Sequence, residues 1–271
     1  MITKAIIPVA GWGTRLLPIT KVIEKAMLPV GNRPLVDYIV QDCIKAGITD
    51  IYFVIAEGST QLKQYYSDND QLNQYLIQNG KNDFLKTIAL PVEVTFHYIE
   101  QPRAGKYGTA VPVALAAEYI VDDESAVVLM GDEFVYNVDG SSEVKRLIDS
   151  VGDSDGALMG TRVPGEEAGK YGLIEMSEGN EFIRIAEKQE SSEPTSLVNI
   201  SKYVLNHEAI KRIVDFVSTD QPGEYYITDP INDYVAAGGR LKVIEAQGEY
   251  LDGGSPEGLL HASRVVMGDL A

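Results

Sequence analysis

The sequence is poor in the residues that build disulfides and zinc sites. Its 271 residues include one cysteine, Cys43, and three histidines, His97, His207 and His261. A single cysteine cannot form an internal disulfide, and the histidines stand in none of the spacings that bind zinc. Any bound metal would have to be held by carboxylates, which favours Mg²⁺.

Long apolar runs are also missing. No stretch of the sequence approaches the roughly 18 apolar residues that a membrane-spanning helix needs, and the first residues do not follow the pattern of a signal peptide. We therefore expect a cytoplasmic protein with neither a membrane anchor nor a signal peptide.

Positive charge is scarce, and much of it lies near the N-terminus. The chain has 23 Lys and Arg against 40 Asp and Glu, a formal net charge of −17. Such a surface repels nucleic acid and anionic lipid, so we expect no nucleic-acid partner. Residues 1–33 nevertheless carry a local charge of +4, which leaves −21 for the remainder. A cationic segment in an acidic protein suits a small polyanionic ligand.

The hydrophobic pattern predicts one α/β domain. Strands and helices alternate in the first half, with expected strands at 4–10, 50–56, 92–98 and 126–130 and expected helices at 34–47 and 109–120. This alternation predicts a parallel sheet with right-handed crossovers. The polar residues 58–86 are expected to form a surface insertion.

After residue 156 the pattern changes to shorter strands and hairpins. Strands are expected at 157–163, 172–176, 182–187 and 196–205, and helices at 208–217, 230–237 and 256–266. We expect this half to extend the same sheet with mixed strand directions.

A glycine loop follows the first expected strand. Gly11 and Gly13 invite a dinucleotide-binding interpretation, but Leu16 stands at the third glycine position of GxGxxG, and no P-loop Lys-Ser/Thr follows. What remains is a glycine turn and two cations, Arg15 and Lys25, at the carboxyl end of a strand. A tight turn with solvated cations is the alternative, and the local charge excess favours a ligand site.

The whole loop resembles a known signature. Gly-x-Gly-Thr-Arg-x-x-Pro-x-Thr-Lys over 11–21, then Lys25 and Met27-Leu28-Pro29, is similar to the sugar-1-phosphate nucleotidylyltransferases, most closely their bacterial UTP–glucose-1-phosphate uridylyltransferase branch. Further motifs follow in the family's order: Gln101 to Val111, Met130-Gly131-Asp132, Tyr171-Gly172, Glu187-Lys188, Tyr203-Val204-Leu205, Thr228-Asp229 and Asp252-Gly253-Gly254.

The resemblance implies a fold and its division. The fold would be a Rossmann-like nucleotidyltransferase α/β fold, with a mixed, mostly parallel central sheet flanked by helices. The single domain, 1–271, would comprise a nucleotide-binding half, 1–155, and a hairpin-rich sugar-binding half with the C-terminal helices, 156–271.

The resemblance also implies roles for individual residues. Arg15, Lys25 and Asp132 would be catalytic, the two cations holding the triphosphate. The nucleotide would be bound by Ala10, Gly11, Gly13, Thr14, Gln101 and Gly108. The sugar phosphate would be bound by Tyr171, Gly172, Glu187 and Lys188.

Asp132 and Asp252 would together hold Mg²⁺. Asp132 directly follows an apolar strand, so its carboxylate should project into the crevice where open α/β sheets bind ligands. Taken singly, both aspartates would more often belong to turns or helix caps.

Three departures from the family pattern stand out. The order Gly105-Lys106 replaces the usual Lys-Gly, which bears on base choice. Ser201-Lys202 replaces Gly-Arg, which bears on the fit of the sugar. Glu24 replaces a proline, which bears on the stiffness of the loop beside Lys25.

By this resemblance the expected activity is uridylyl transfer from UTP to glucose 1-phosphate, giving UDP-glucose and pyrophosphate, by a homo-oligomer, a dimer or a tetramer. Thymidylyl transfer from dTTP is the alternative within the family. A non-catalytic sugar-nucleotide-binding regulator is the alternative from another class, which the presence of both aspartates disfavours. A dehydrogenase is disfavoured by Leu16 and by the cationic loop.

Overall fold

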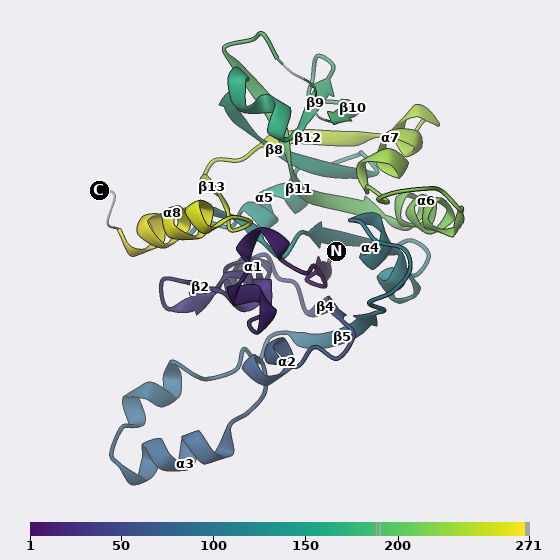
Figure 1. The fold of residues 1–271 in the computed structure, drawn as a ribbon. Coiled ribbons are helices and arrows are strands. Elements are labelled where there is room, and N and C mark those ends of the chain that lie inside the picture. The colour runs from purple at the N-terminus through teal and green to yellow at the C-terminus, as the bar shows by residue number, and fades with distance from the viewer. Residues whose placement is uncertain (188, 190, 269–271) are drawn as a thin grey trace.

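The computed structural model describes residues 1–187, 189 and 191–268. A sheet of nine strands forms its centre (Figure 1). These strands are β1 (Lys4–Pro8), β4 (Asp50–Ala56), β5 (Thr95–Gln101), β6 (Ser125–Leu129), β8 (Gly156–Pro164), β9 (Gly172–Met176), β10 (Phe182–Glu187), β11 (Thr195–Asn206) and β12 (Leu241–Glu245). The order along the main path is β10-β9-β11-β6-β1-β4-β5, and β8 pairs with both β11 and β12.

The N-terminal part of the sheet is parallel. β1 pairs in parallel with β4 and β6, and β4 pairs in parallel with β5. β11 then joins β6 in the antiparallel direction, and its other antiparallel partners are β8 and β9. The predicted α/β class with a mixed central sheet is confirmed. Because β1 lies between β4 and β6, the loop that follows it opens at the middle of the sheet, where such folds bind ligands.

Helices cover both faces of the sheet (Figure 1). They are α1 (Leu35–Lys45), α4 (Ala110–Ala116), α5 (Glu143–Asp149), α6 (His207–Ser218), α7 (Thr228–Ala236) and α8 (Pro256–Met267). Successive residues of β1 enter different cores, because strand side chains alternate between the faces. Ile7 belongs to the core cluster that includes residues of α1, α5 and α8, whereas Ile6 belongs to the one that includes residues of α4, α6 and α7. This two-sided burial explains why the central residues of β1, Ala5 to Ile7, are all apolar.

Two small antiparallel ladders complete the described strands. β7 (Glu133–Tyr136) pairs with β13 (Glu249–Asp252), and β2 (Pro29–Val30) pairs with β3 (Arg33–Pro34). The sequence pattern predicted none of these four strands. The short 3₁₀ turns are η1 (Thr14–Leu16), η2 (Ile19–Lys21), η3 (Lys25–Met27), η4 (Asn82–Lys86), η5 (Ala117–Tyr119) and η6 (Gly165–Lys170).

The polar insertion contains α2 (Gln61–Tyr65), α3 (Asp70–Gln78) and η4. In Figure 1, α3 extends away from the sheet, while α2 stays close to β5. The strand expected at 92–98 is displaced to β5, because the ladder with β4 begins only where Thr95 meets Asp50. Val92 is 91% exposed and lies before this ladder.

Within the described residues, no helix is both long and apolar enough to cross a membrane.

Candidate active site

The glycine loop after β1 folds back on itself at Gly13. This residue has a φ of +63°, and a Cβ on it would lie 2.9 Å from Thr20 Cγ2 and 3.2 Å from Lys25 Cβ. The Thr20 hydroxyl donates a 2.8 Å hydrogen bond to the Gly13 carbonyl oxygen. Glycine is thus required here for a close approach, which brings Lys25 beside the turn. At Gly11, in contrast, a Cβ would meet no atom of the described residues within 4 Å, so crowding by them does not explain that glycine.

A cavity of about 710 Å³ opens between the glycine loop, the end of β5 and the loop after β6. Its walls include every residue that the sequence predicted to bind the nucleotide: Ala10, Gly11, Gly13, Thr14, Gln101 and Gly108. Lys25 and Asp132 also line it. The structure therefore gathers these predicted residues, which are dispersed in the sequence, around one space.

Asp132 reaches the cavity because Gly131 packs closely against the end of β1. The Gly131 N–H donates a 3.1 Å hydrogen bond to the Pro8 carbonyl oxygen. A Cβ on Gly131 would overlap the Val9 side chain and lie 2.8 Å from the same oxygen. Only glycine permits this approach, which sets Asp132 beside the glycine loop.

Lys25 and Asp132 form an ion pair between Lys25 Nζ and Asp132 Oδ2. The Lys25 side chain is 13% exposed and that of Asp132 is 33% exposed. Charges with this degree of burial are screened by salt less than surface charges are. A cation and a carboxylate are thus fixed together in the cavity wall.

Asp252 lies close to Asp132 through the β7–β13 ladder. Asp252 pairs with Glu133, the residue that follows Asp132, and the Gly253 N–H donates a 2.9 Å hydrogen bond to the Asp132 carbonyl oxygen. The main chains of the two aspartates predicted to share a metal therefore lie close together at one end of this ladder. Asp252 Oδ1 accepts a 2.7 Å hydrogen bond from the Gly254 N–H.

Arg15 reaches the same place from the glycine loop. A Cβ on Gly254 would lie 3.2 Å from Arg15 Nη2 and 2.7 Å from Asp252 Oδ1. The guanidinium and the Asp252 carboxylate thus flank Gly254. Neither Arg15 nor Asp252 is among the described residues that line the large cavity, so they lie to one side of the Lys25–Asp132 pair.

Residues 105–110 form the opposite wall and are fastened to the chain before α7. The Tyr225 N–H donates to the Tyr107 carbonyl oxygen and the Ala110 N–H to the Tyr225 carbonyl oxygen, each at 2.9 Å. Gly108 has a φ of +120°, and a Cβ on it would overlap the main chain of Tyr225. Glycine at 108 is therefore required both by conformation and by space.

The exchanged pair Gly105-Lys106 has a structural explanation. Lys106 Nζ donates 2.6 Å hydrogen bonds to the carbonyl oxygens of Val217 and Thr219 at the end of α6, and it lies 5.3 Å from the centre of the Tyr225 ring. Cations stabilise the free carbonyls at helix C-termini. Lys106 thus anchors the loop to α6.

Three of the residues predicted to bind the sugar phosphate, Tyr171, Gly172 and Glu187, are described, and they lie outside this cavity. Gly172 and Glu187 are partners in the β9–β10 ladder, and a Cβ on Gly172 would lie 3.1 Å from Glu187 Oε1. The Tyr171 ring meets the Tyr250 ring edge-on, with their centres 6.4 Å apart, and burial raises the pKa of Tyr171. The predicted Lys188 lies outside the described residues.

Sequence reasoning missed a buried cluster beneath the aspartates. The Tyr250 hydroxyl donates to Glu133 Oε2, whereas Glu133 Oε1 is buried and has no hydrogen-bond partner among the described residues. Burial raises the pKa of Glu133 to about 7; Lys202 opposes this shift, and the carboxylates of Asp132 and Asp252 add to it. Glu133 directly follows Met130-Gly131-Asp132, and this position was the only signal in the sequence.

Lys202, noted in the sequence only as a departure, is the cation of this cluster. Its side chain is buried, and its Nζ donates to the carbonyl oxygens of Glu133, at 3.2 Å, and Ile200, at 3.3 Å. Burial lowers the pKa of Lys202, and the surrounding carboxylates, that of Glu133 first, oppose the shift. Lys202 therefore places a buried ammonium against the main chain of Glu133.

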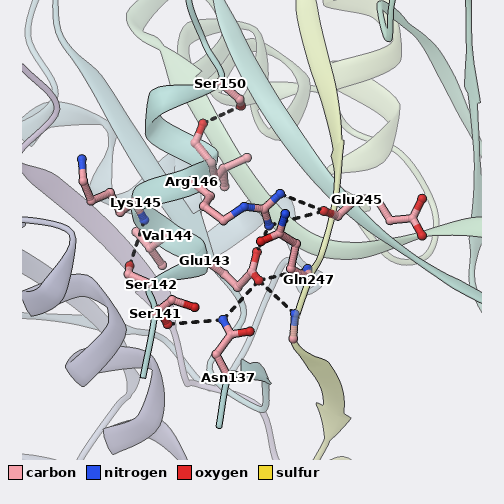
Figure 2. Close-up of polar contacts among 12 residues, drawn as sticks. Asn137, Ser141, Ser142, Glu143, Val144, Lys145, Arg146, Ser150, Glu245 and Gln247 are labelled. Carbon is pink, nitrogen blue, oxygen red and sulfur yellow. Dashed lines mark hydrogen bonds and ion pairs between the residues drawn. The ribbon is translucent and has the colours of Figure 1, made fainter. Parts of the chain in front are cut away.

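Glu143 holds together the far end of the β7–β13 ladder (Figure 2). Its Oε1 accepts hydrogen bonds from the N–H groups of Gln247 and Gly248, each at 3.0 Å, and from Asn137 Nδ2 at 3.1 Å. Its Oε2 is paired with Arg146. Asn137 follows β7 and Gly248 precedes β13, so this buried carboxylate joins both strands at the end opposite the two aspartates.

Comparisons with known proteins agree with this geometry. The chain is 31% identical to a UTP–glucose-1-phosphate uridylyltransferase of Pseudomonas aeruginosa, over 97% of this chain and 95% of the relative. It is 30% identical to UTP–glucose-1-phosphate uridylyltransferase 2 of Streptococcus pyogenes, over 97% of this chain and 89% of the relative.

Solved structures give the same result. The UTP-bound UGPase of Acinetobacter baumannii superimposes with a TM-score of 0.86 at 28% identity, over 98% of this chain and 93% of that one. A UDP-glucose pyrophosphorylase complexed with UDP-glucose superimposes with a TM-score of 0.80 at 26% identity, over 99% of this chain and all of that one. The profile of the nucleotidyl transferase family matches residues 4–267, and the chain therefore belongs to this family.

Proposed function

We propose that this protein is a UTP–glucose-1-phosphate uridylyltransferase, which joins UTP and glucose 1-phosphate to give UDP-glucose and pyrophosphate. The observation that carries the proposal is that the glycine loop, the Lys25–Asp132 pair and the loop around Gly108 all border the same cavity. The relatives that cover nearly the whole chain carry this activity in their names. One solved neighbour is described as bound to UTP.

The reaction brings two anions together. An oxygen of the sugar phosphate attacks the α-phosphorus of UTP, and the bond to pyrophosphate breaks. Two like unit charges about 4 Å apart repel by roughly 4 kcal/mol at an effective dielectric constant near 20. Fixed cations must offset this repulsion as charge shifts onto the leaving group. Lys25, in the cavity wall, and Arg15, beside Gly254, supply these charges from the segment that follows β1.

The carboxylates of Asp132 and Asp252 suit Mg²⁺. They offer hard oxygen donors on segments that the Gly253 N–H joins to the Asp132 carbonyl oxygen. Mg²⁺ is commonly held by one or two carboxylates with substrate phosphates and water completing its shell. Within the described ranges, no three His, Cys, Asp or Glu side chains form a metal-binding group, so the protein alone would supply only part of the shell. When bound, the ion would neutralise phosphate charge.

The remaining residues bind the nucleotide in the N-terminal half of the chain and the glucose phosphate in the C-terminal half. Gln101 offers an amide whose donor and acceptor can pair with the edge of uracil, and Gly108 brings the main chain close to the base. Gly172, Glu187 and Tyr171 bind the glucose phosphate, and Lys188 is assigned to its phosphate on the sequence alone.

We further propose that the enzyme is a cytoplasmic homo-oligomer, a dimer or a tetramer, and that it has no nucleic-acid or membrane partner. The net charge of −17 supports the last point.

Pyrophosphate release from a matrix of UTP, dTTP, CTP and ATP against several hexose 1-phosphates tests the proposal. We expect the highest kcat/KM for UTP with glucose 1-phosphate. A clear preference for dTTP would move the protein to the thymidylyl branch. Lack of turnover with every pair, together with tight binding of UDP-glucose, would instead identify a regulator.

A further inference from the structure

Glu24, the residue before Lys25, is held by α2 through its carboxylate. Glu24 Oε2 accepts a 2.7 Å hydrogen bond from the Ser59 hydroxyl. Glu24 Oε1 accepts hydrogen bonds from the N–H groups of Thr60 and Gln61, each at 3.2 Å. These amides lie at the start of α2, where N–H groups have no partner within the helix. The carboxylate of one segment therefore caps a helix of another.

The contact is reciprocal. Gln61 Oε1 accepts a 3.0 Å hydrogen bond from the Glu24 N–H, and Gln61 Nε2 donates a 2.7 Å hydrogen bond to the Val22 carbonyl oxygen. Both side chains thus reach across to the main chain of the other segment, which fixes the loop at 22–24 in position and in direction.

α2 is a firm support for this contact because it is anchored in the core. Leu62 is fully buried and Tyr66 is 8% exposed. The Tyr66 hydroxyl donates a 2.9 Å hydrogen bond to Asp37 Oδ1 in α1. The base of the insertion is therefore part of the same packed face as α1, and Glu24 ties the loop to it.

The hydrogen bonds to α2 restrain the backbone conformation of Glu24. Glu24 has φ −59° and ψ +136°, and η3 begins at the next residue, Lys25. A proline ring would impose nearly the same φ covalently. In this chain the hydrogen bonds to α2 provide the restraint, and the turn that follows carries the Lys25 ammonium to Asp132.

We propose that Glu24 is a positioning residue for Lys25: its carboxylate locks the loop onto α2 and thereby holds the Lys25 ammonium at the phosphate-binding wall of the cavity. The inference rests on the proposed function for the identity of the ligand. Glu24 does not line the cavity, so it acts through Lys25. Misplacing a catalytic group by about 1 Å can lower a rate by about a hundredfold.

The test compares E24A, E24P and a matched control, E124A. Alanine removes the carboxylate without restraining φ, whereas proline restrains φ and lacks both the carboxylate and the N–H. The control removes a carboxylate that also accepts from a main-chain amide, that of Val121, and from Lys4. Glu124 precedes β6, at the end of the strand opposite the cavity. For each variant, kcat, KM for UTP, KM for glucose 1-phosphate and Tm are measured.

We expect E24A to lose about tenfold or more in kcat/KM for UTP, with an unchanged KM for glucose 1-phosphate. E24P should recover part of that loss, because it restores the backbone restraint although it cannot donate to Gln61. E124A should lower Tm by a similar amount without changing the kinetic constants. The proposal is overturned if E24A matches E124A in kinetics, if both KM values rise together, or if E24P is no better than E24A.

Failure of this inference can be told apart from failure of the proposed function. An inactive wild-type protein contradicts the function, whereas an active wild type with an unimpaired E24A contradicts only the positioning role. UTP binding measured by calorimetry gives the same comparison among variants without turnover: weaker binding by E24A than by E24P and E124A supports the role, and equal binding contradicts it.

Discussion

Asp252 stands opposite Glu133 in the β7–β13 ladder, which makes it a neighbour of Asp132 although the two aspartates belong to different halves of the chain. Their approach depends on the main chain of a short ladder. The far end of that ladder is joined by Glu143 (Figure 2). The metal-binding carboxylates we propose are thus set by pairing between strands.

Lys25 and Asp132 should act as one unit in catalysis. We expect K25M and D132N each to lower kcat by about a hundredfold or more, because K25M removes a cation placed where negative charge develops and D132N removes a proposed Mg²⁺ ligand. The double variant should be little worse than either single one, since paired groups are not additive. Pyrophosphate release gives the rates, and K21M, which removes an exposed cation from the same loop, is the control. If the losses in kcat from K25M and D132N add up in the double variant, the prediction that Lys25 and Asp132 act together is wrong.

The two aspartates should determine the Mg²⁺ requirement. We expect chelation to abolish turnover, and D252N to need about tenfold or more Mg²⁺ for half-maximal rate, because loss of one ligand weakens a site of two carboxylates. A titration of rate against Mg²⁺ measures this shift. D139N removes an exposed acceptor that follows β7 and should leave the curve unchanged; an unshifted curve for D252N would exclude it as a ligand.

Many residues of this site were predicted from the sequence, but the β7–β13 ladder that supports it was not. Glycine turns and aspartates after apolar strands are local signals, and the predicted nucleotide residues do share one cavity. The β7–β13 ladder was not predicted because its strands are short and its pairing joins residues far apart, as in the Tyr250–Glu133 contact.

Lys202 and Glu24 were noted in the sequence as departures from the family pattern, but their contacts were not predicted, for a similar reason. A lysine in a strand and a glutamate in a loop are usually solvated, and only the fold shows that one is buried against the Glu133 carbonyl oxygen and that the other caps α2. Long-range partners decide the role of such charges, and no local pattern encodes them.

Two glycines of the base loop should respond differently to alanine. Gly105 and Gly108 both have positive φ, +106° and +120°, but only Gly108 lacks room for a Cβ. We expect G105A to cost about 1 kcal/mol of stability through backbone strain alone. G108A should in addition displace the loop from Tyr225 and raise KM for UTP by about tenfold or more. Steady-state kinetics and Tm are measured for both variants. Equal effects of G105A and G108A would contradict the inference that close contact with Tyr225 requires glycine at 108.

Trp12 should report nucleotide binding directly. It is the only tryptophan in the chain, it lines the cavity, and the centre of its ring lies 4.1 Å from Arg103 Cζ on the opposite loop. We expect UTP to change the tryptophan emission of the wild type, because the ligand enters between these loops. R103A should weaken UTP binding by a few-fold, in line with the about 0.5–1 kcal/mol of an exposed cation–π contact. An emission spectrum that saturating UTP leaves unchanged would place the nucleotide elsewhere.

Asp42 should make stability depend on pH in a definite direction. Burial raises the pKa of this carboxyl. Within the part of the chain that the structure describes, its Oδ1 has no hydrogen-bond partner, while Oδ2 accepts from the Val144 N–H at 3.2 Å. A raised pKa means that the folded state binds the proton more tightly, so the contribution is full below pH 3.8, the ordinary value, and is lost as pH rises through the folded pKa. D42N cannot ionise, and its Tm relative to wild type should therefore increase from about pH 4 towards neutrality. The exposed D149N should show no such trend. A Tm difference between D42N and wild type that falls as pH rises would contradict the raised pKa of Asp42.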